Sequence, residues 1–477
     1  MRWKRIVLTA VTGVLLIVVY HGWQALPIAT GYAAKTMASG IFLSNRDKAD
    51  IEAYDLNFFP VKNASCTIDY EDSSVTCSLM GLSSAKAIYR HGLGATLVNG
   101  LDENEIRAQK FTLAISPKIS PDTIPWPMGD KHTDSFPVCV DSTAVAAAVA
   151  KTFAGNDTDT PITNITRALI VLYDGKIIAE RYAPGITRNT KLTGWSMTKS
   201  VTSALVGLLV KEGRLQVEGP APVPEWKDPK DPRHQISIRQ LLQQTNGLDF
   251  EERYDVPADA NRMLFVEGDA AAFTAAHPLK NKPGTDFRYS SGNTNILSRI
   301  IRQTTGETNY HAYPYQALFH KIGMYNTVLE PDASGTFVGS SFCYATARDW
   351  ARFGLLYLNN GRVNGQYLLP ENWVKESTTP STAAETGEYG FQWWLNAGAK
   401  SNPQKRSYPA LPTDMYYADG YEGQNIFVIP SSRLVVVRLG LTKAHYWGEV
   451  ELLQSLIRSI DTSKLEGNVS IHPSKTQ

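Results

Sequence analysis

The chain has 477 residues, of which 43% are hydrophobic and 19% are charged, so it is long enough to bury a large core. Its formal net charge is +1 and no Lys/Arg-rich run stands out, which argues against a nucleic-acid partner. We expect one large domain with an N-terminal extension rather than several domains of average size.

The first 34 residues have the pattern of a secretory signal peptide or a membrane anchor. A basic start, Met1–Arg5, precedes an apolar stretch over residues 6–20, and no further charge occurs before Lys35. This stretch is short for a spanning helix, which needs about 18 residues, but residues 22–26 could lengthen it. The pattern favours an inner-membrane anchor with the rest of the chain in the periplasm, the alternative being a cleaved signal and secretion to the periplasm.

The four cysteines agree with export. Cys66 and Cys77 flank a turn between two short stretches of strand character, which makes them cross-strand neighbours in a hairpin. A disulfide between them is favoured in an oxidising compartment, and the alternative is two reduced strand cysteines. Cys139 and Cys343 show no reason to pair. We place the extension that carries this hairpin over residues 35–137, ending in a proline-punctuated linker.

A hairpin and a buried helix follow the linker. Residues 169–180 predict two strands, because apolar stretches flank Asp174-Gly175, a strong type I′ turn signal. The next apolar stripe has helical spacing between Val201 and Leu209 and stops at Gly213. The sequence therefore predicts strand, strand and buried helix in succession.

Ser196 and Lys199 stand at the start of this helix, three residues apart and on one face. A lysine in a dry pocket has a lowered pKa and can accept the proton of a serine hydroxyl, which turns the serine into a nucleophile. The alternative is an ordinary helix N-terminus. Ser83 and Lys86 have the same spacing, but no buried helix surrounds them, so we interpret them as a surface match.

Tyr289 and Ser291 lie in a turn just before the apolar helix 296–301. Together with Ser196-x-x-Lys199, this turn resembles the class C β-lactamase-related serine hydrolases over residues 168–460. That penicillin-recognising superfamily includes D-alanyl-D-alanine peptidases, esterases and 6-aminohexanoate-dimer hydrolases. The resemblance implies that Tyr289-Ser290-Ser291 is the second motif, in which Tyr289 shuttles the proton and Ser291 contacts the substrate. The alternative for Tyr289 is a buried aromatic beside a turn.

The third motif of the superfamily is best matched by Gly420-Tyr421-Glu422-Gly423-Gln424, at the entry to a strand. Gly423 would let the substrate lie against the backbone, and the amide of Gln424 would pair with that of Ser196 as an oxyanion hole. Tyr421 occupies the position where β-lactamases and carboxypeptidases usually offer Lys or His, so we do not expect efficient β-lactamase activity. The alternative is a glycine-rich turn without catalytic duty.

The resemblance implies a β-lactamase/transpeptidase-like α/β (α+β) fold, with an antiparallel sheet flanked by helices and a separate helical region. We expect the sheet to contain residues 169–182 and 424–440, with a terminal helix over 450–460 packed on one face. The segment 238–248 also resembles the superfamily and is expected to be scaffold. The hydrolase domain is predicted over residues 138–465, and residues 466–477 form a polar tail.

The predicted activity is hydrolysis of a small ester or amide through an acyl-enzyme on Ser196. The sequence offers no Gly-x-Ser-x-Gly elbow, no zinc-type His-Glu-x-x-His and no phosphate-binding loop, so we expect no cofactor and no metal. The alternatives are a catalytically idle envelope protein that binds peptidoglycan or a peptide, and a D-Ala-D-Ala peptidase or weak β-lactamase. The sequence does not predict an oligomeric state.

Overall fold

The structure is a computed structural model that describes residues 22–466 apart from 116, 118–119, 133–134, 155–163 and 444–445. The described chain forms two compact units, each built from several stretches of sequence. Unit 1 comprises residues up to 114, 198–315 and 327–344, and unit 2 comprises 115–197, 316–326 and the residues from 345 onward. The domain boundaries expected at residues 34, 137 and 465 stay predictions.

Unit 2 is built around a six-stranded antiparallel sheet in the order β12-β13-β14-β15-β5-β6. Asp174 and Gly175 both have positive φ, as a type I′ turn requires, so the predicted hairpin is confirmed. The strands are β5 (Asn164–Tyr173), β6 (Lys176–Tyr182), β12 (Trp394–Leu395), β13 (Tyr416–Gly420), β14 (Gln424–Ile429) and β15 (Leu434–Thr442).

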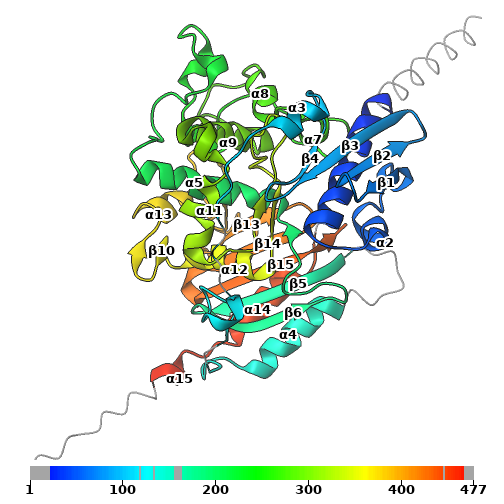
Figure 1. Ribbon diagram of the computed structural model, residues 1–477. Coiled ribbons are helices and arrows are strands. Elements are labelled where there is room, and N and C mark those ends of the chain that lie inside the picture. The colour runs from blue at the N-terminus through cyan, green and yellow to red at the C-terminus, as the bar shows by residue number, and fades with distance from the viewer. Residues whose placement is uncertain are drawn as a thin grey trace, which may run out of the picture. The chain divides into compact units, whose positions relative to one another are not determined.

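Helices cover both faces of this sheet (Figure 1). On one face, α4 (Ser142–Ala154) and α14 (Glu449–Arg458) share a buried core with alternate strand residues such as Phe427 and Val436. On the other face lies α12 (Ala347–Leu358), whose Gly354 permits close approach, because a Cβ there would lie 2.5 Å from Val435 Cγ1. The predicted sandwich, with its terminal helix on one face, is therefore confirmed. The remaining elements of unit 2 are β7 (Leu192–Thr193), β10 (Arg362–Val363), β11 (Gln366–Tyr367), α13 (Trp373–Ser377), α15 (Ser463–Glu466) and the 3-10 turns η4 (Pro121–Thr123), η6 (Trp195–Met197), η9 (Phe319–Ile322) and η10 (Pro430–Ser432).

Unit 1 combines the residues before 115, which form most of the N-terminal extension, with much of the helical region. Its long helices include α5, which is buried along most of its length, and α9. The helices are α2 (Lys48–Asp50), α3 (Glu103–Ala108), α5 (Thr198–Lys211), α6 (Ile238–Leu242), α7 (Asp259–Phe265), α8 (Ala270–Ala275), α9 (Ser291–Thr305), α10 (Glu307–Tyr310) and α11 (Tyr313–Ala317), and the strands β8 (Val328–Leu329) and β9 (Cys343–Ala345) pair with each other.

Residues 22–38 are helical, and much of this helix is buried in unit 1. Lys35 is 2% exposed and forms an ion pair with Glu330, which is fully buried. Glu330 also accepts hydrogen bonds from the Ala95 amide at 2.7 Å and from the Ser39 hydroxyl at 3.0 Å. A buried ion pair therefore links the extension to the helical region.

The apolar stretch over residues 6–20, expected to be a signal or an anchor, lies outside the described residues. Within the part of the chain that the structure describes, no helix has both the length and the apolar character that crossing a membrane requires.

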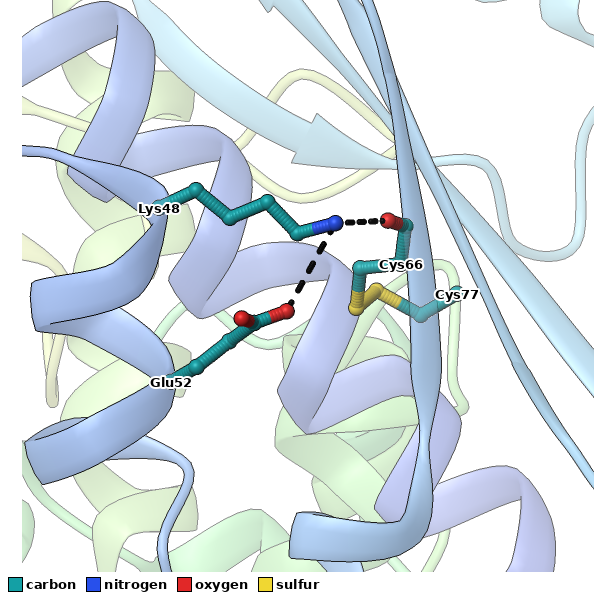
Figure 2. The surroundings of a disulfide bond; sticks show 4 residues. All are labelled: Lys48, Glu52, Cys66 and Cys77. Atoms are coloured by element: carbon teal, nitrogen blue, oxygen red, sulfur yellow. Dashed lines mark hydrogen bonds and ion pairs between the residues drawn. A yellow bond between two sulfur atoms is a disulfide. The ribbon is translucent and has the colours of Figure 1, made fainter.

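A disulfide joins Cys66 and Cys77 in the extension, as predicted (Figure 2). The two cysteines are direct partners in the β1–β2 hairpin, and Lys48 donates a hydrogen bond of 2.8 Å to the Cys66 carbonyl. Lys86 lies on β3 rather than on a helix and forms ion pairs with acidic side chains, which agrees with a surface match at Ser83. The strands of this sheet are β1 (Ser65–Asp69), β2 (Ser74–Leu79), β3 (Ser83–Arg90) and β4 (Gly94–Leu97).

Replacing Cys66 and Cys77 together by serine should lower the free energy of unfolding of unit 1 by about 2–3 kcal/mol, because the bridge closes a short loop in the unfolded chain. Denaturant titration of the oxidised wild type and the double variant measures this difference. Reductant should destabilise the wild type and leave the double variant unchanged. Equal stability of the two proteins without reductant would contradict a stabilising bridge.

Candidate active site

Lys199 lies near the start of α5 and is 1% exposed. Its ammonium donates hydrogen bonds to Ser291 Oγ at 2.9 Å and to the Ser340 carbonyl at 3.1 Å. The Tyr289 ring faces it, with 4.9 Å between Nζ and the ring centroid. Unit 1 therefore brings together three residues that the sequence singled out: Lys199, Tyr289 and Ser291.

The second motif is held in place by the segment 238–248. Asn246 donates to the Asn293 side chain at 2.6 Å, and Asn293 donates to Gln244 at 2.6 Å. Gln244 also accepts from the Ser290 amide at 3.2 Å. These buried amides fix the start of α9, which begins at Ser291, so the scaffold role expected for this segment agrees with the structure.

The loop before α7 contributes two side chains that the sequence analysis did not identify. Glu252 accepts hydrogen bonds from Ser291 Oγ at 2.5 Å and from the Ser291 amide at 2.8 Å. Tyr254 donates to Glu252 at 2.7 Å, and its hydroxyl lies 3.3 Å from Ser291 Oγ. Ser291 thus connects the buried lysine to a carboxylate.

Burial lowers the pKa of Lys199 from its ordinary value of 10.5 to about 8, while the negative charge of Glu252 acts in the opposite direction. A lysine with this pKa is partly neutral near neutral pH. In that form Nζ has a lone pair and can accept a proton from a hydroxyl. Lys199 can therefore take the neutral form that a general base requires.

Ser196 lies in the 3-10 turn η6, and α5 begins two residues later, so the serine precedes the helix rather than opening it. The boundary between the units falls directly after Met197, which assigns Ser196 to unit 2 and Lys199 to unit 1. Ser196 is partly exposed. Its neighbour Trp195 has a φ of 45°, a left-handed conformation that bulky residues rarely adopt and that is often found at functional sites.

Two glycines allow η6 to pack tightly within unit 2. A Cβ on Gly194 would lie 2.2 Å from the Trp350 ring on α12, and a Cβ on Gly420 would lie 2.2 Å from the Gly194 carbonyl oxygen. The rings of Trp195 and Tyr421 meet edge to face at a centroid distance of 5.7 Å. The turn that carries Ser196 therefore lies directly against the proposed third motif.

Gly423 and Gln424 lie in the turn that joins β13 to β14. The Gly423 amide donates to the Gly420 carbonyl at 3.1 Å, and its φ is 77°. A Cβ there would lie 2.6 Å from Arg438 Nη1, so this glycine makes room for a buried arginine as well as for the turn. The Gln424 side chain donates to the Gly440 carbonyl at 2.5 Å.

The structure thus groups the predicted site residues in two sets. Lys199, Tyr289 and Ser291 meet in unit 1, and Ser196 belongs to the same unit as Gly423 and Gln424. Sequence reasoning missed Glu252, Tyr254 and Ser340, which contribute through a loop or a backbone carbonyl. It named Gly420 as the start of the third motif but did not predict the close approach of the Gly194 backbone.

Within the described ranges, no group of three or more His, Cys, Asp or Glu side chains is arranged to hold a metal ion. The expectation that the reaction needs neither metal nor cofactor stays a prediction.

Comparison with known proteins identifies the family. The model of the β-lactamase family matches residues 165–450. The 6-aminohexanoate-dimer hydrolase of Paenarthrobacter ureafaciens is 26% identical over 302 residues, which are 57% of this chain and 72% of that protein.

Solved structures share the fold. EstCE1, a hydrolase with promiscuous acyltransferase activity, matches with a TM-score of 0.54 at 16% identity, over 67% of this chain and 98% of its own. A family VIII carboxylesterase matches with a TM-score of 0.53 at 16% identity, over 68% of this chain and 99% of its own.

The family model covers more than half of the present sequence and includes every predicted site residue. The chain therefore belongs to the β-lactamase family of serine hydrolases.

Proposed function

We propose that this serine hydrolase cleaves small, neutral esters or amides through an acyl-enzyme formed on Ser196. The observation that carries the proposal is the environment of Lys199. A fully buried lysine with a pKa of about 8, bonded to Ser291 and facing Tyr289, stands three residues after a partly exposed serine. Because Lys199 follows Ser196 by only three residues, their Cα atoms lie at most about 11 Å apart, even if the chain between them is fully extended.

In the proposed reaction, Ser196 Oγ attacks the substrate carbonyl and its proton passes to the neutral Lys199 and Tyr289 pair. The backbone amides of Ser196 and Gln424 would stabilise the tetrahedral oxyanion. Tyr289 would then protonate the leaving alcohol or amine, leaving the acyl group on Ser196. A water molecule deprotonated by the same pair would release the acid and restore the hydroxyl. We assign this proton to the Lys199 and Tyr289 pair rather than to one of the two residues, because interacting groups share their titration.

The preference for neutral substrates follows from the charges around the third motif. Tyr421 stands at the position where β-lactamases and carboxypeptidases usually have Lys or His. Glu422, in the same turn as Tyr421, forms a 2.6 Å ion pair with Lys443. Arg438 is buried and donates to the Glu422 and Gly423 carbonyls. Lys443 and Arg438 are therefore already engaged by the protein, which supports recognition of an uncharged acyl group.

We also propose that the protein is exported and that its N-terminal segment attaches it to the inner membrane, facing the periplasm. The basic start and apolar stretch of residues 1–20 support this proposal. The Cys66–Cys77 disulfide supports an oxidising compartment. Fractionation of cells that produce the full chain, followed by alkaline extraction of membranes, tests it, and recovery only in the cytoplasm would contradict it.

Replacing Ser196 by alanine should lower kcat/KM for a p-nitrophenyl ester by at least about 10³-fold, because the nucleophile is lost. The change should alter stability by no more than about 1 kcal/mol, since the side chain is partly exposed. A fluorophosphonate probe should label the wild type at Ser196 and leave this variant unlabelled. Activity within tenfold of wild type would contradict the assignment.

Short p-nitrophenyl esters should be hydrolysed orders of magnitude faster in kcat/KM than a chromogenic cephalosporin, because Tyr421 stands where a cation would bind the carboxylate of the cephalosporin. Tyr421→Lys should narrow the gap, and Tyr421→Phe is the matched control. A panel with 6-aminohexanoate dimer and D-Ala-D-Ala peptides separates the amidase and peptidase alternatives. Cephalosporin hydrolysis by the wild type at about 10⁵ M⁻¹s⁻¹ or more would refute the preference.

Gly420→Ala should lower kcat/KM about 100-fold, because the new methyl group must push the Gly194 carbonyl, and with it the Ser196 turn, out of position. Gly185→Ala is the control: its φ of 79° disfavours alanine, yet nothing lies within 4 Å of the added Cβ. Steady-state kinetics of both variants, with circular dichroism to verify folding, distinguishes misplacement from general strain. Unchanged turnover in Gly420→Ala would show that this contact does not position the nucleophile.

A further inference from the structure

We propose that Glu252 is a positioning residue of the hydrolytic site, which fixes the Ser291 hydroxyl against Lys199 and stabilises the protonated form of that lysine. The catalytic meaning of this role rests on the proposed function, whereas the coupling between Glu252 and Lys199 is a property of unit 1 alone. Nothing in the sequence pattern around Glu252 indicates it, because the residue lies in an irregular loop that belongs to none of the three motifs.

The direction of each hydrogen bond is fixed by chemistry. An ammonium can only donate and an ionised carboxylate can only accept, so Ser291 Oγ accepts from Lys199 and donates its single proton to Glu252. The second carboxylate oxygen of Glu252 accepts from the Ser291 amide at 2.8 Å. Glu252 therefore holds the amide and the hydroxyl of Ser291 and leaves one orientation for the hydroxyl. That orientation presents the lone pairs of Ser291 to Lys199.

Tyr254 supports the carboxylate from the same loop, donating to Glu252 at 2.7 Å. Arg253, between them in sequence, forms an ion pair with Asp255 at 2.9 Å and lies 3.5 Å from Glu251. Among the described residues, the negative charge of Glu252 opposes the effect of burial on the pKa of Lys199. The Lys199 ammonium also faces the Tyr289 ring and donates to the Ser340 carbonyl.

The magnitude of the coupling follows from distance. Hydrogen bonds of 2.9 and 2.5 Å through Ser291 place Lys199 Nζ within about 5.4 Å of the carboxylate oxygen. An opposite charge at that range shifts a pKa by about 1–3 units, and partial exposure of Glu252 favours the lower end. Burial lowers the pKa of Lys199, and Glu252 limits that decrease, which keeps the pKa near the pH at which a general base works best.

The test measures the pKa of Lys199 directly, by NMR titration of protein labelled with ¹³C at the lysine ε-carbon, with Lys199→Arg to assign the signal. Glu252→Gln keeps the shape and an acceptor oxygen but removes the charge, so the pKa should fall by about one unit. Glu252→Asp keeps the charge and should restore most of the difference. Glu251→Gln, the same charge change one residue earlier on an exposed side chain, should leave the pKa unchanged.

The pH profile of kcat/KM for a p-nitrophenyl ester provides the second readout. Activity needs neutral Lys199 and is lost as pH falls through its pKa, so the acidic limb of Glu252→Gln should move about one unit to lower pH. An unchanged lysine titration in folded Glu252→Gln would overturn the inference even if the wild type hydrolyses esters. If the pKa of Lys199 shifts in Glu252→Gln but the wild type hydrolyses none of the substrates, the proposed function is overturned, and the coupling between Glu252 and Lys199 stands.

Discussion

The ammonium group of Lys199 lies in the interior of unit 1, where a charge without partners would be strongly unfavourable. Ser291 at the start of α9 and the Ser340 carbonyl both accept from it. Hydrogen bonds also fix the two residues that supply these acceptors. The Ser291 amide donates to Glu252, and the Ser340 amide donates to the Asn295 side chain. The polar contacts at the starts of α5 and α9 therefore provide the hydrogen-bond acceptors that a buried lysine needs.

Structural features that depend on a local sequence pattern could be predicted from the sequence. The Asp174-Gly175 hairpin, the buried helix after Ser196 and the Cys66–Cys77 bridge all depend on neighbours within a few residues, and each is confirmed. The family resemblance then placed residues 169–182 and 424–440 in one antiparallel sheet, a long-range pairing that local pattern does not encode. The same reasoning placed Lys199, Tyr289 and Ser291 together, because motif spacing in a family reflects a shared three-dimensional arrangement.

Contacts whose partners are distant in sequence and carry no side-chain signature could not be predicted. Ser340 contributes a backbone carbonyl, which any residue would offer. Gly420 is needed because another backbone approaches it, and only the folded chain shows which of the two glycines in that turn has this neighbour. Glu252 is one carboxylate among several in a charged loop, distinguished solely by the position of Ser291.

The buried pair of Lys35 and Glu330 has a consequence for the evolution of this chain. Glu330 lies inside the span that matches the family, whereas Lys35, Ser39 and the Ala95 amide lie outside it, in the extension. With the extension in place, a Glu330 carboxylate that lost Lys35 would stay buried without a counter-charge, at a cost of several kcal/mol. A substitution at position 35 or 330 alone is therefore expected to be more harmful than a paired change that removes both charges.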